Sequence, residues 1–256
     1  MALAPAEIEH YRREGWCLAG PVLAPAECDA IAAEYDRMRQ VIRLGAADDG
    51  PVVYQPMLAA RSALLRPYLV DPRLVDVMLQ LVGPNVRMYW EQMVSKPAGA
   101  RTELPWHQDD GYAPTDPPGY ATAWLALDDA DEENGGMWVI PRSHTGGIYR
   151  HRMDGPHFRS GLEGWTGDTT GVAAPLGKGE ALLFSSLTLH RSGPNRSARP
   201  RRGWIVQYCD AACRHGVTGE ALDDRPWVAR DGRRLAEPVA ERPIDVGRVF
   251  ANWAVV

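Results

Sequence analysis

The change of hydrophobic period at Gly83 is the feature that most constrains the fold of this chain. After it, the stretch VRMYWEQMVSKP alternates as an extended strand does. The side chains that then share one face are Val86, Met88, Trp90, Gln92, Val94 and Lys96. Further segments with the composition of strands are 122–130, 136–141, 180–190 and 203–209. Turn-rich stretches such as DEENGG and PLGKGE separate them, so the sequence predicts a run of short strands.

Two helical patterns precede Gly83. From Pro25, apolar residues recur at helical spacing as far as Met38. The segment 71–83 offers Asp71 as the N-cap, Pro72 at the first helical position and Gly83 as the stop. Helices followed by strands predict an α+β protein built around an antiparallel β-sandwich or barrel.

Two segments match neither a helix nor a strand. Residues 149–171 form a long polar stretch with several glycines and aromatic residues, and loops of this length in compact domains are usually functional or disordered. We expect this loop to be a mobile lid that closes over a substrate and excludes water. The tail from Gly219 is expected to be similarly irregular.

Composition narrows the classes of function. The 256 residues are 45% hydrophobic and 24% charged, which suits one globular domain over residues 1–256. The net charge of −5, with no long basic run, argues against nucleic acid or an anionic membrane as a partner. We find no signal peptide and no apolar run that could span a bilayer, so we expect a cytoplasmic protein. The four cysteines lack CxxC spacing and are expected to be free thiols.

The stretch PWHQDDGY contains a candidate pair of metal ligands. His107 and Asp109 are two residues apart, so on a strand both would point to the same side. His190, which we expect at the end of an apolar strand, could be the third ligand. Two histidines and one carboxylate form the facial triad that suits non-haem Fe(II) and leaves positions open for a co-substrate and oxygen.

Less specific interpretations of these residues stay open. An H-x-D pair often arises by chance, and both histidines could be packed residues bonded to a carboxylate or a carbonyl. Asp110 is expected to be a solvated turn residue. The remaining candidates, His144, His151 and His157, are expected to be loop histidines and not ligands.

Three runs in the chain together resemble the phytanoyl-CoA dioxygenase family. They are PWHQDDGY, AWLALDDADEENGGMWVIPRSH and LGKGEALLFSSLTLHRSGPNRSARPRR, and they occur in the family's order and spacing. The resemblance extends from the N-terminal helices to about residue 209. It implies a double-stranded β-helix, or jelly-roll, core with flanking helices. It also implies Fe(II) and 2-oxoglutarate as cofactors, O2 as a co-substrate, and iron ligands at His107, Asp109 and His190.

The resemblance also implies a binding site for 2-oxoglutarate. Arg201, eleven residues after His190, would hold the distal carboxylate of 2-oxoglutarate, and Ser192 would share it. A guanidinium group suits this role because its planar fork pairs with a carboxylate through two hydrogen bonds. The neighbouring Arg199 and Arg202 are expected to be solvated or salt-bridged.

Other contacts transfer from the family less specifically. Thr122, Trp124 and Gln92 lie where the family lines its co-substrate pocket, although ordinary core packing would explain them equally well. Lys96 is expected to be an exposed lysine at a strand end. Tyr112, with the 149–171 loop, is expected to border the substrate.

The sequence therefore predicts an Fe(II)- and 2-oxoglutarate-dependent dioxygenase acting on a small molecule, with release of succinate and CO2. Hydroxylation of a specialised metabolite is the preferred reaction, and desaturation, epimerisation and ring closure are alternatives. A non-catalytic, cupin-like metal-binding module is the alternative from another class, but it needs no carboxylate clamp such as Arg201 with Ser192. A related halogenase would lack the acid ligand, and here Asp109 is present.

Overall fold

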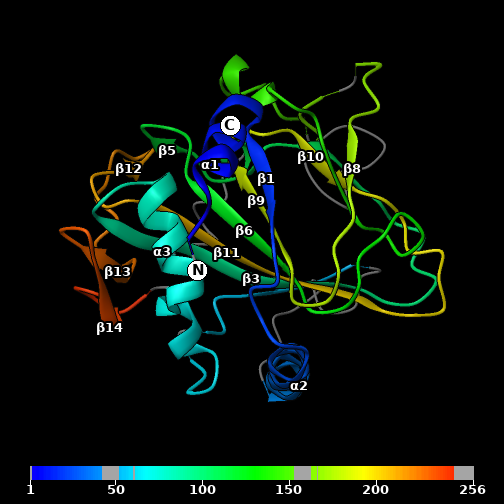
Figure 1. The fold of residues 1–256 in the computed structure, drawn as a ribbon, viewed down its shortest axis with the longest axis horizontal. Helices are drawn as coiled ribbons and strands as arrows, with labels where there is room; N and C mark the ends of the chain where they lie inside the picture. The colour runs from blue at the N-terminus through cyan, green and yellow to red at the C-terminus, as the bar shows by residue number, and fades with distance from the viewer. Residues whose placement is uncertain (1, 42–51, 60, 153–162, 166, 245–256) are drawn as a thin grey trace.

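The computed structural model describes residues 2–41, 52–59, 61–152, 163–165 and 167–244 (Figure 1). The α-helices are α1 (Pro5–Glu14), α2 (Pro25–Val41) and α3 (Pro72–Leu81). The short 3-10 helices are η2 (Arg66–Val70), η3 (Asp109–Gly111) and η4 (Ser143–Gly146). No helix in the described part of the chain is both long and apolar enough to cross a bilayer.

The larger antiparallel sheet has the hydrogen-bonded order β1–β9–β6–β11–β3–β13–β14, and β2 also pairs with β3. Its strands are β1 (Trp16–Ala19), β2 (Val53–Pro56), β3 (Val86–Lys96), β6 (Ala121–Ala126), β9 (Ala181–Ser185), β11 (Arg201–Asp210), β13 (Trp227–Arg230) and β14 (Arg233–Val239). In Figure 1 these strands cross the centre of the molecule, and the β13–β14 hairpin lies at the left.

A smaller sheet has the order β4–β10–β7–β8. Its strands are β4 (Leu104–His107), β7 (Met137–Val139), β8 (Val172–Ala174) and β10 (His190–Ser192). A separate two-stranded ribbon pairs β5 (Thr115–Asp116) with β12 (Arg214–His215). The larger sheet and this four-stranded sheet are the two sheets of the predicted double-stranded β-helix.

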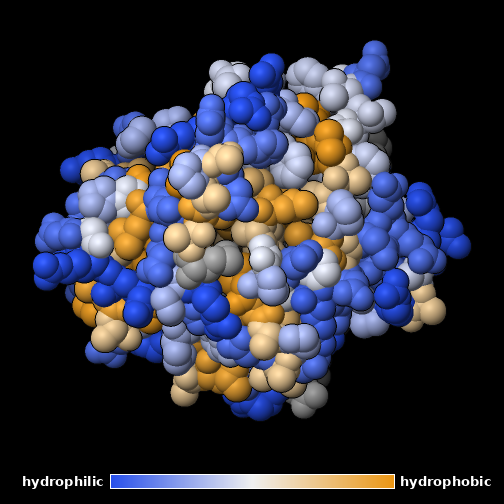
Figure 2. Space-filling view, in the orientation of Figure 1, coloured by the Kyte–Doolittle hydropathy of each residue, from blue (hydrophilic) through white to orange (hydrophobic). Residues whose placement is uncertain are grey.

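The larger sheet has two differently packed faces. Its outer face joins α2 and α3 in one core, where Tyr35 and Met78 from the helices pack with Trp204 of β11. Its inner face faces the smaller sheet, and there Trp124 of β6 packs in a second core with Met137 of β7. On the surface that Figure 2 shows, apolar residues gather near the middle and hydrophilic residues surround them.

Strand β3 follows the predicted alternation from Trp90 to Lys96, but Val86 and Met88 pack in the outer core and do not share that face. Trp90, Gln92 and Val94 line a cavity on the inner face. Glu91 points to the outer face, where it accepts hydrogen bonds from Trp204 Nε1 and the Ala59 amide, each at 2.9 Å. The register with β11 shifts between Gln207 and Tyr208, which pair with Trp90 and Met88. This bulge leaves Tyr89 without a partner in the register, and Tyr89 also lines the cavity.

The predicted helices are confirmed. The carboxylate of Asp71 accepts a hydrogen bond from the Arg73 amide at 2.8 Å, so Asp71 caps α3, and Pro72 is its first residue. Leu74 and Met78 are among the residues that α3 buries. Helix α1 was not predicted; it buries no residue, so it carries no strong apolar stripe for a sequence pattern to reveal.

Two predictions about strands were wrong. The segment 180–190 is not one strand: β9 ends at Ser185, the chain turns, and β10 begins at His190 in the other sheet. His190 therefore starts a strand. The tail from Gly219 is not irregular either, because β13 and β14 form a hairpin that extends the larger sheet. The central part of the proposed lid, residues 153–162, lies outside the described residues, so the lid stays a prediction.

Candidate active site

Three side chains with metal-binding atoms meet between the two sheets. His107 ends β4 and His190 begins β10, and the two are direct partners in the antiparallel register. Their ring centroids are 4.1 Å apart. Asp109 lies in η3, not on the strand, so the 3-10 turn brings its carboxylate back towards the histidines. One candidate ligand atom from each residue lies within 4.8 Å of the other two.

Backbone carbonyls orient both histidines. Nδ1 of His107 lies 2.8 Å from the Pro105 carbonyl oxygen, and Nδ1 of His190 lies 2.9 Å from the Thr188 carbonyl oxygen. A carbonyl oxygen only accepts hydrogen bonds, so each Nδ1 carries the proton and each Nε2 keeps its lone pair. Burial lowers the pKa of His107 to about 3, which keeps the imidazole neutral as metal binding requires.

Two polar side chains hold the Asp109 carboxylate. Its Oδ2 accepts hydrogen bonds from Thr122 Oγ1 and Gln207 Nε2, each at 2.8 Å. Burial alone would raise the pKa of Asp109, but His190, His107 and the Thr122 hydrogen bond lower it below its usual value. Thr122 is fully buried behind Asp109 and is not among the cavity-lining residues, so it supports a candidate ligand from behind. Gln207 was missed because its role depends on the pairing of β11 with β6, where it faces Thr122.

Arg201 is a buried cation without a partner in the described part of the chain. It is 1% exposed, and none of its three guanidinium nitrogens has a hydrogen-bond partner there. The hydroxyl of Ser192, also 1% exposed, is unpartnered in the same sense. The Arg201 guanidinium carbon lies 5.3 Å from the centre of the Trp124 ring. Burial lowers the pKa of Arg201 to about 10, so the side chain remains a cation at neutral pH. A bound anion would stabilise this buried charge.

The two neighbouring arginines already have acidic partners. Arg202 makes hydrogen bonds of 2.8 Å from Nε and Nη2 to the two carboxylate oxygens of Asp128. Arg199 is exposed and lies 3.4 Å from Asp131. Both agree with the prediction that they are solvated or salt-bridged. Of these three arginines, only Arg201 faces the cavity.

Two residues expected at the surface are buried instead. Lys96 is fully buried and donates to the carbonyl oxygens of Ser192, at 3.0 Å, and Gly193. Burial lowers the pKa of Lys96 to about 6. Asp110 is 1% exposed and accepts hydrogen bonds from the Thr115 amide at 3.0 Å and from other donors. Chain position alone does not reveal this burial: Asp110 lies within the turn that follows β4, and Lys96 packs against the carbonyls at the end of β10.

His151 and Gln108 join the start of the 149–171 loop to the metal-binding turn. The Gln108 amide, between His107 and Asp109, donates to His151 Nε2 at 2.8 Å. The Gln108 side chain in turn accepts a hydrogen bond from the Tyr149 amide at 2.7 Å. His151 is 6% exposed, as a histidine in a packed position would be, and it is not part of the triad.

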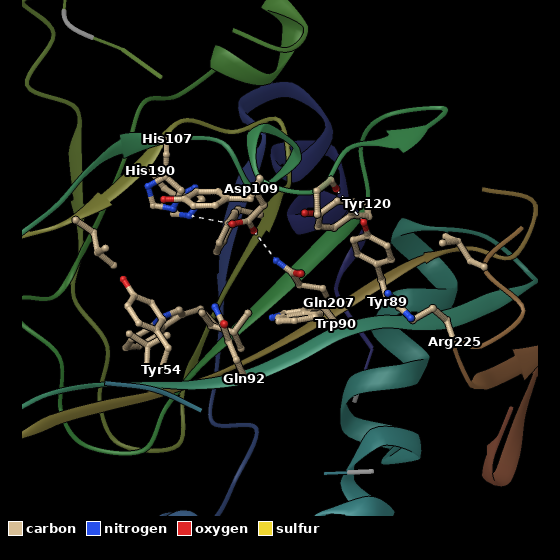
Figure 3. A pocket seen from close by; sticks show the side chains of 18 of the residues that line it. Tyr54, Tyr89, Trp90, Gln92, His107, Asp109, Tyr120, His190, Gln207 and Arg225 are labelled. Atoms are coloured by element: carbon tan, nitrogen blue, oxygen red, sulfur yellow. Dashed lines mark hydrogen bonds and ion pairs between the residues drawn. The ribbon is translucent and has the colours of Figure 1, made fainter. Parts of the chain in front are cut away.

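A cavity of about 300 Å³ connects these groups. It extends from Arg201 and Ser192, past the triad, to a wall formed by residues 215–225 and Arg242. Figure 3 shows Tyr54 and Gln92 near one end and Tyr89, Tyr120 and Arg225 towards the other, with Asp109 between them. The predicted contacts Gln92, Trp124, Ser192 and Tyr112 line this cavity. Tyr54, Tyr89, Tyr120 and Arg225 also line it, and no sequence motif marked them.

The chain is similar in sequence to a family of known dioxygenases. Residues 11–203 match the family model of phytanoyl-CoA dioxygenase (PhyH). A probable alpha-ketoglutarate-dependent hypophosphite dioxygenase of Stutzerimonas stutzeri is 32% identical over 146 residues, which cover 54% of this chain and 50% of that protein. The chain thus matches half the length of this relative. The phytanoyl-CoA dioxygenase domain-containing protein 1 of Danio rerio is 26% identical over 254 residues, which cover 78% of this chain and 87% of that protein.

Solved structures share the fold over nearly the whole chain. The alpha-ketoglutarate-dependent carbocyclase SnoK from nogalamycin biosynthesis has a TM-score of 0.73 at 24% identity, covering 89% of this chain and 97% of SnoK. The epimerase SnoN, crystallised with Fe3+, alpha-ketoglutarate and nogalamycin RO, has a TM-score of 0.69 at 25% identity, covering 95% of this chain and 96% of SnoN.

These matches confirm the predicted fold, and the predicted cofactors, iron and 2-oxoglutarate, are those crystallised with SnoN. The predicted enzyme class is also the class to which these relatives belong. The family model spans most of the chain and includes all three triad residues, Arg201 and Ser192. The chain therefore belongs to the phytanoyl-CoA dioxygenase family.

Proposed function

We propose that this protein is an Fe(II)- and 2-oxoglutarate-dependent oxygenase that oxidises a small specialised metabolite. His107, Asp109 and His190 would bind the iron, and Arg201 with Ser192 would bind the distal carboxylate of 2-oxoglutarate. The observation that carries the proposal is the buried, unpartnered guanidinium of Arg201 in the same cavity as the triad. A metal-binding module without a co-substrate would have no use for a desolvated cation there.

The residues present fit both groups. The two Nε2 lone pairs and the Asp109 carboxylate are the neutral and anionic donors that Fe(II) binds. The arginine fork and the Ser192 hydroxyl together offer three or more donors to one carboxylate. When bound, iron and 2-oxoglutarate together would supply the oxygen activation that leads to attack on a C–H bond.

The protein's own contribution is placement and the exclusion of water. Thr122 and Gln207 fix the Asp109 carboxylate from behind. Lys96 fixes the turn that carries Ser192 through its bonds to two carbonyl oxygens. The inner-face aromatics, Trp124 and Phe184 among them, keep this end of the cavity largely apolar, which strengthens the ion pair expected at Arg201.

Among the possible reactions we favour hydroxylation. Two structural neighbours, SnoK and SnoN, are named as a carbocyclase and an epimerase of nogalamycin biosynthesis, which supports a specialised metabolite as the substrate class. The family name points instead to an acyl-CoA.

The test is anaerobic addition of 2-oxoglutarate to the Fe(II)-loaded protein, followed by admission of O2. We expect a visible charge-transfer absorption from the chelate and then the release of succinate, at a slow rate even without the substrate. Absence of both signals, in protein that has bound one equivalent of Fe(II), would refute the proposed function.

A further inference from the structure

Strand β3 runs along the cavity, so its length gives the distance between the two ends of the cavity. At one end Arg201 pairs with Lys96 in the register of β11 and β3. At the other end the Met88 amide donates to the carbonyl oxygen of Pro226, which follows Arg225. The paired stretch of β11, from Arg201 to Tyr208, spans seven steps from residue to residue, so at roughly 3.4 Å each these two backbone positions are about 24 Å apart. Asp109 lies between the two ends, because its partner Gln207 pairs with Trp90.

A buried ion pair forms part of the wall at the Arg225 end. Arg225 and Asp224 are 7% and 6% exposed, and Arg225 Nη1 donates to Asp224 Oδ2 at 2.8 Å. Both residues line the cavity. The Nε of Arg225 has no hydrogen-bond partner in the described part of the chain. Arg87 holds the backbone here by donating to the Arg225 carbonyl oxygen at 2.7 Å. The pair is therefore a fixed donor and a fixed acceptor side by side.

Each arginine that lines this end of the cavity has an acidic partner. The other arginine on this wall, Arg242, pairs with the carboxylate of Asp223. Glu220 adds a further carboxylate to the wall. Both arginines that line the described wall at this end are thus paired, in contrast to Arg201 at the opposite end.

Aromatic rings separate the triad from this ion pair. Tyr89 and Tyr120 pack with their ring centroids 4.6 Å apart, and both line the cavity. Tyr112 meets His107 edge-on at 5.3 Å between centroids. The guanidinium carbon of Arg225 lies 5.7 Å from the centre of the Tyr89 ring. Figure 3 shows Tyr120 and Tyr89 between Asp109 and Arg225. This stretch of wall favours a flat, apolar ring system.

We propose that the substrate is an uncharged, ring-bearing molecule whose hydroxyl or carbonyl oxygens bind the Arg225–Asp224 pair. This inference rests on the proposed function and names its substrate class. A hydroxyl group can accept a hydrogen bond from the guanidinium and donate one to the carboxylate at the same time. A carboxylate or phosphate would instead be repelled by Asp224, because its attraction to Arg225 is already opposed by that neighbour.

The same charges argue against an acyl-CoA. Its phosphate groups need cations that are not already paired. In the described wall of the cavity, Arg191, Arg225 and Arg242 each have an acidic partner, and the unpaired Arg201 is required for 2-oxoglutarate.

The position of these residues in the chain supports a role in selectivity. Asp224, Arg225 and Arg242 all lie beyond residues 11–203, which match the family model. The triad and Arg201 lie within it. The polar part of the proposed substrate site thus lies outside the part of the chain that the family model covers.

Two matched probes test the proposal without turnover. Aloe-emodin is a neutral hydroxylated three-ring quinone, and rhein carries a carboxylate in place of its hydroxymethyl group. Binding is measured by quenching of tryptophan fluorescence in protein that holds Mn(II) and 2-oxoglutarate, with palmitoyl-CoA as a third probe. We expect wild-type protein to bind aloe-emodin at least roughly tenfold more tightly than rhein, and more tightly than palmitoyl-CoA.

Variants of the ion pair should change this preference in opposite directions. Asp224→Asn leaves Arg225 without its acid, so we expect the preference for aloe-emodin over rhein to fall by about tenfold or to reverse. Arg225→Gln leaves the acid without its cation, so rhein should bind still more weakly. Glu237→Gln is the control, because it removes one exposed acid from β14 without changing the wall. If one of the two ion-pair variants does not fold, the direction in which the other changes the preference for aloe-emodin over rhein still tests the proposal.

The proposal is overturned if wild-type protein binds neither quinone, or prefers rhein or palmitoyl-CoA. It is also overturned if Asp224→Asn and Arg225→Gln leave the ratio unchanged. Binding of 2-oxoglutarate is measured in parallel for every variant. Absence of the selectivity in wild-type protein that binds 2-oxoglutarate normally counts against this inference alone, whereas failure of wild-type protein to bind 2-oxoglutarate counts against the proposed function.

Discussion

At the Arg201 end of the cavity a buried cation has no partner in the described chain, whereas at the Arg225 end a buried cation is already paired with Asp224. Both arginines are more than nine-tenths buried and both line the same cavity. A desolvated charge without a partner is costly, so the first end is incomplete without an anion. At the second end the cation is already paired, so this end can bind dipoles. Burial of a charge therefore says little about its ligand until its partners are known.

Removal of a triad residue should have the largest effect on binding. It should weaken the binding of Fe(II) at the centre of the cavity and leave binding at the Arg225 end unchanged. For His190→Ala we expect Fe(II) affinity to fall by roughly a thousandfold, since losing a ligand exceeds the 10- to 100-fold effect of losing a residue behind one. Anaerobic metal titration gives the affinity. Wild-type affinity in this variant would remove His190 from the proposed ligand set.

Arg201→Ala tests the unpaired end directly. Losing a charge-assisted pair in a buried pocket costs about 2–5 kcal/mol, so 2-oxoglutarate should bind on the order of a hundredfold more weakly while iron binding is retained. The matched control is Arg199→Ala, which removes an exposed arginine and should change little. Because neither Arg201 nor Arg199 lies at the Arg225 end, we expect both variants to bind aloe-emodin with unchanged affinity. A large effect of Arg199→Ala with none from Arg201→Ala would reverse the assignment.

His151→Ala should have an intermediate effect, and only on metal binding at the triad. The variant loses the acceptor for the Gln108 amide between His107 and Asp109, so we expect Fe(II) affinity to fall by roughly tenfold. His151→Gln can supply a replacement acceptor and should recover part of the loss. His144→Ala, outside this contact, is the control. If His151→Ala and His144→Ala bind Fe(II) equally well, His151 does not position the ligands.

Lys96→Met should have the smallest effect on binding, a few-fold weakening for 2-oxoglutarate, because Lys96 acts only through the Ser192–Gly193 turn. Its clearer signature is in stability. The folded pKa of about 6 lies below the unfolded value of 10.5, so the unfolded chain binds the extra proton between these values. The free energy of unfolding should then rise with pH from 6 to 10.5, by about 1 kcal/mol per pH unit at most.

Urea titrations at pH 7 and pH 9 measure this slope. Wild-type protein should gain stability over the interval, and Lys96→Met should gain clearly less. Equal slopes would mean that Lys96 is not held neutral by burial.

Much of the fold could be predicted because its signals are local. The alternation of β3 and the cap of α3 at Asp71 depend on residues a few positions apart, and both appear in the structure. The division of 180–190 at His190 could not be predicted, because a strand that changes sheet reads as one apolar run until its partners are known. The β13–β14 hairpin was missed for a similar reason, since Trp227 pairs with the distant Arg87.

By itself the sequence indicated which residues could bind a metal and a carboxylate: His107, Asp109 and His190 by their type and spacing, and Arg201 through the resemblance to the family. Only the tertiary structure decided what surrounds them. The depth of Lys96 and Asp110, the support of Asp109 by Gln207, and the pairing of Arg225 with Asp224 at the far end of β3 are examples. Burial and pairing depend on contacts between residues that are tens of positions apart, so no local pattern encodes them. A charged side chain has the same letter in the sequence whether it is solvated, paired or desolvated, and its chemistry differs in each case.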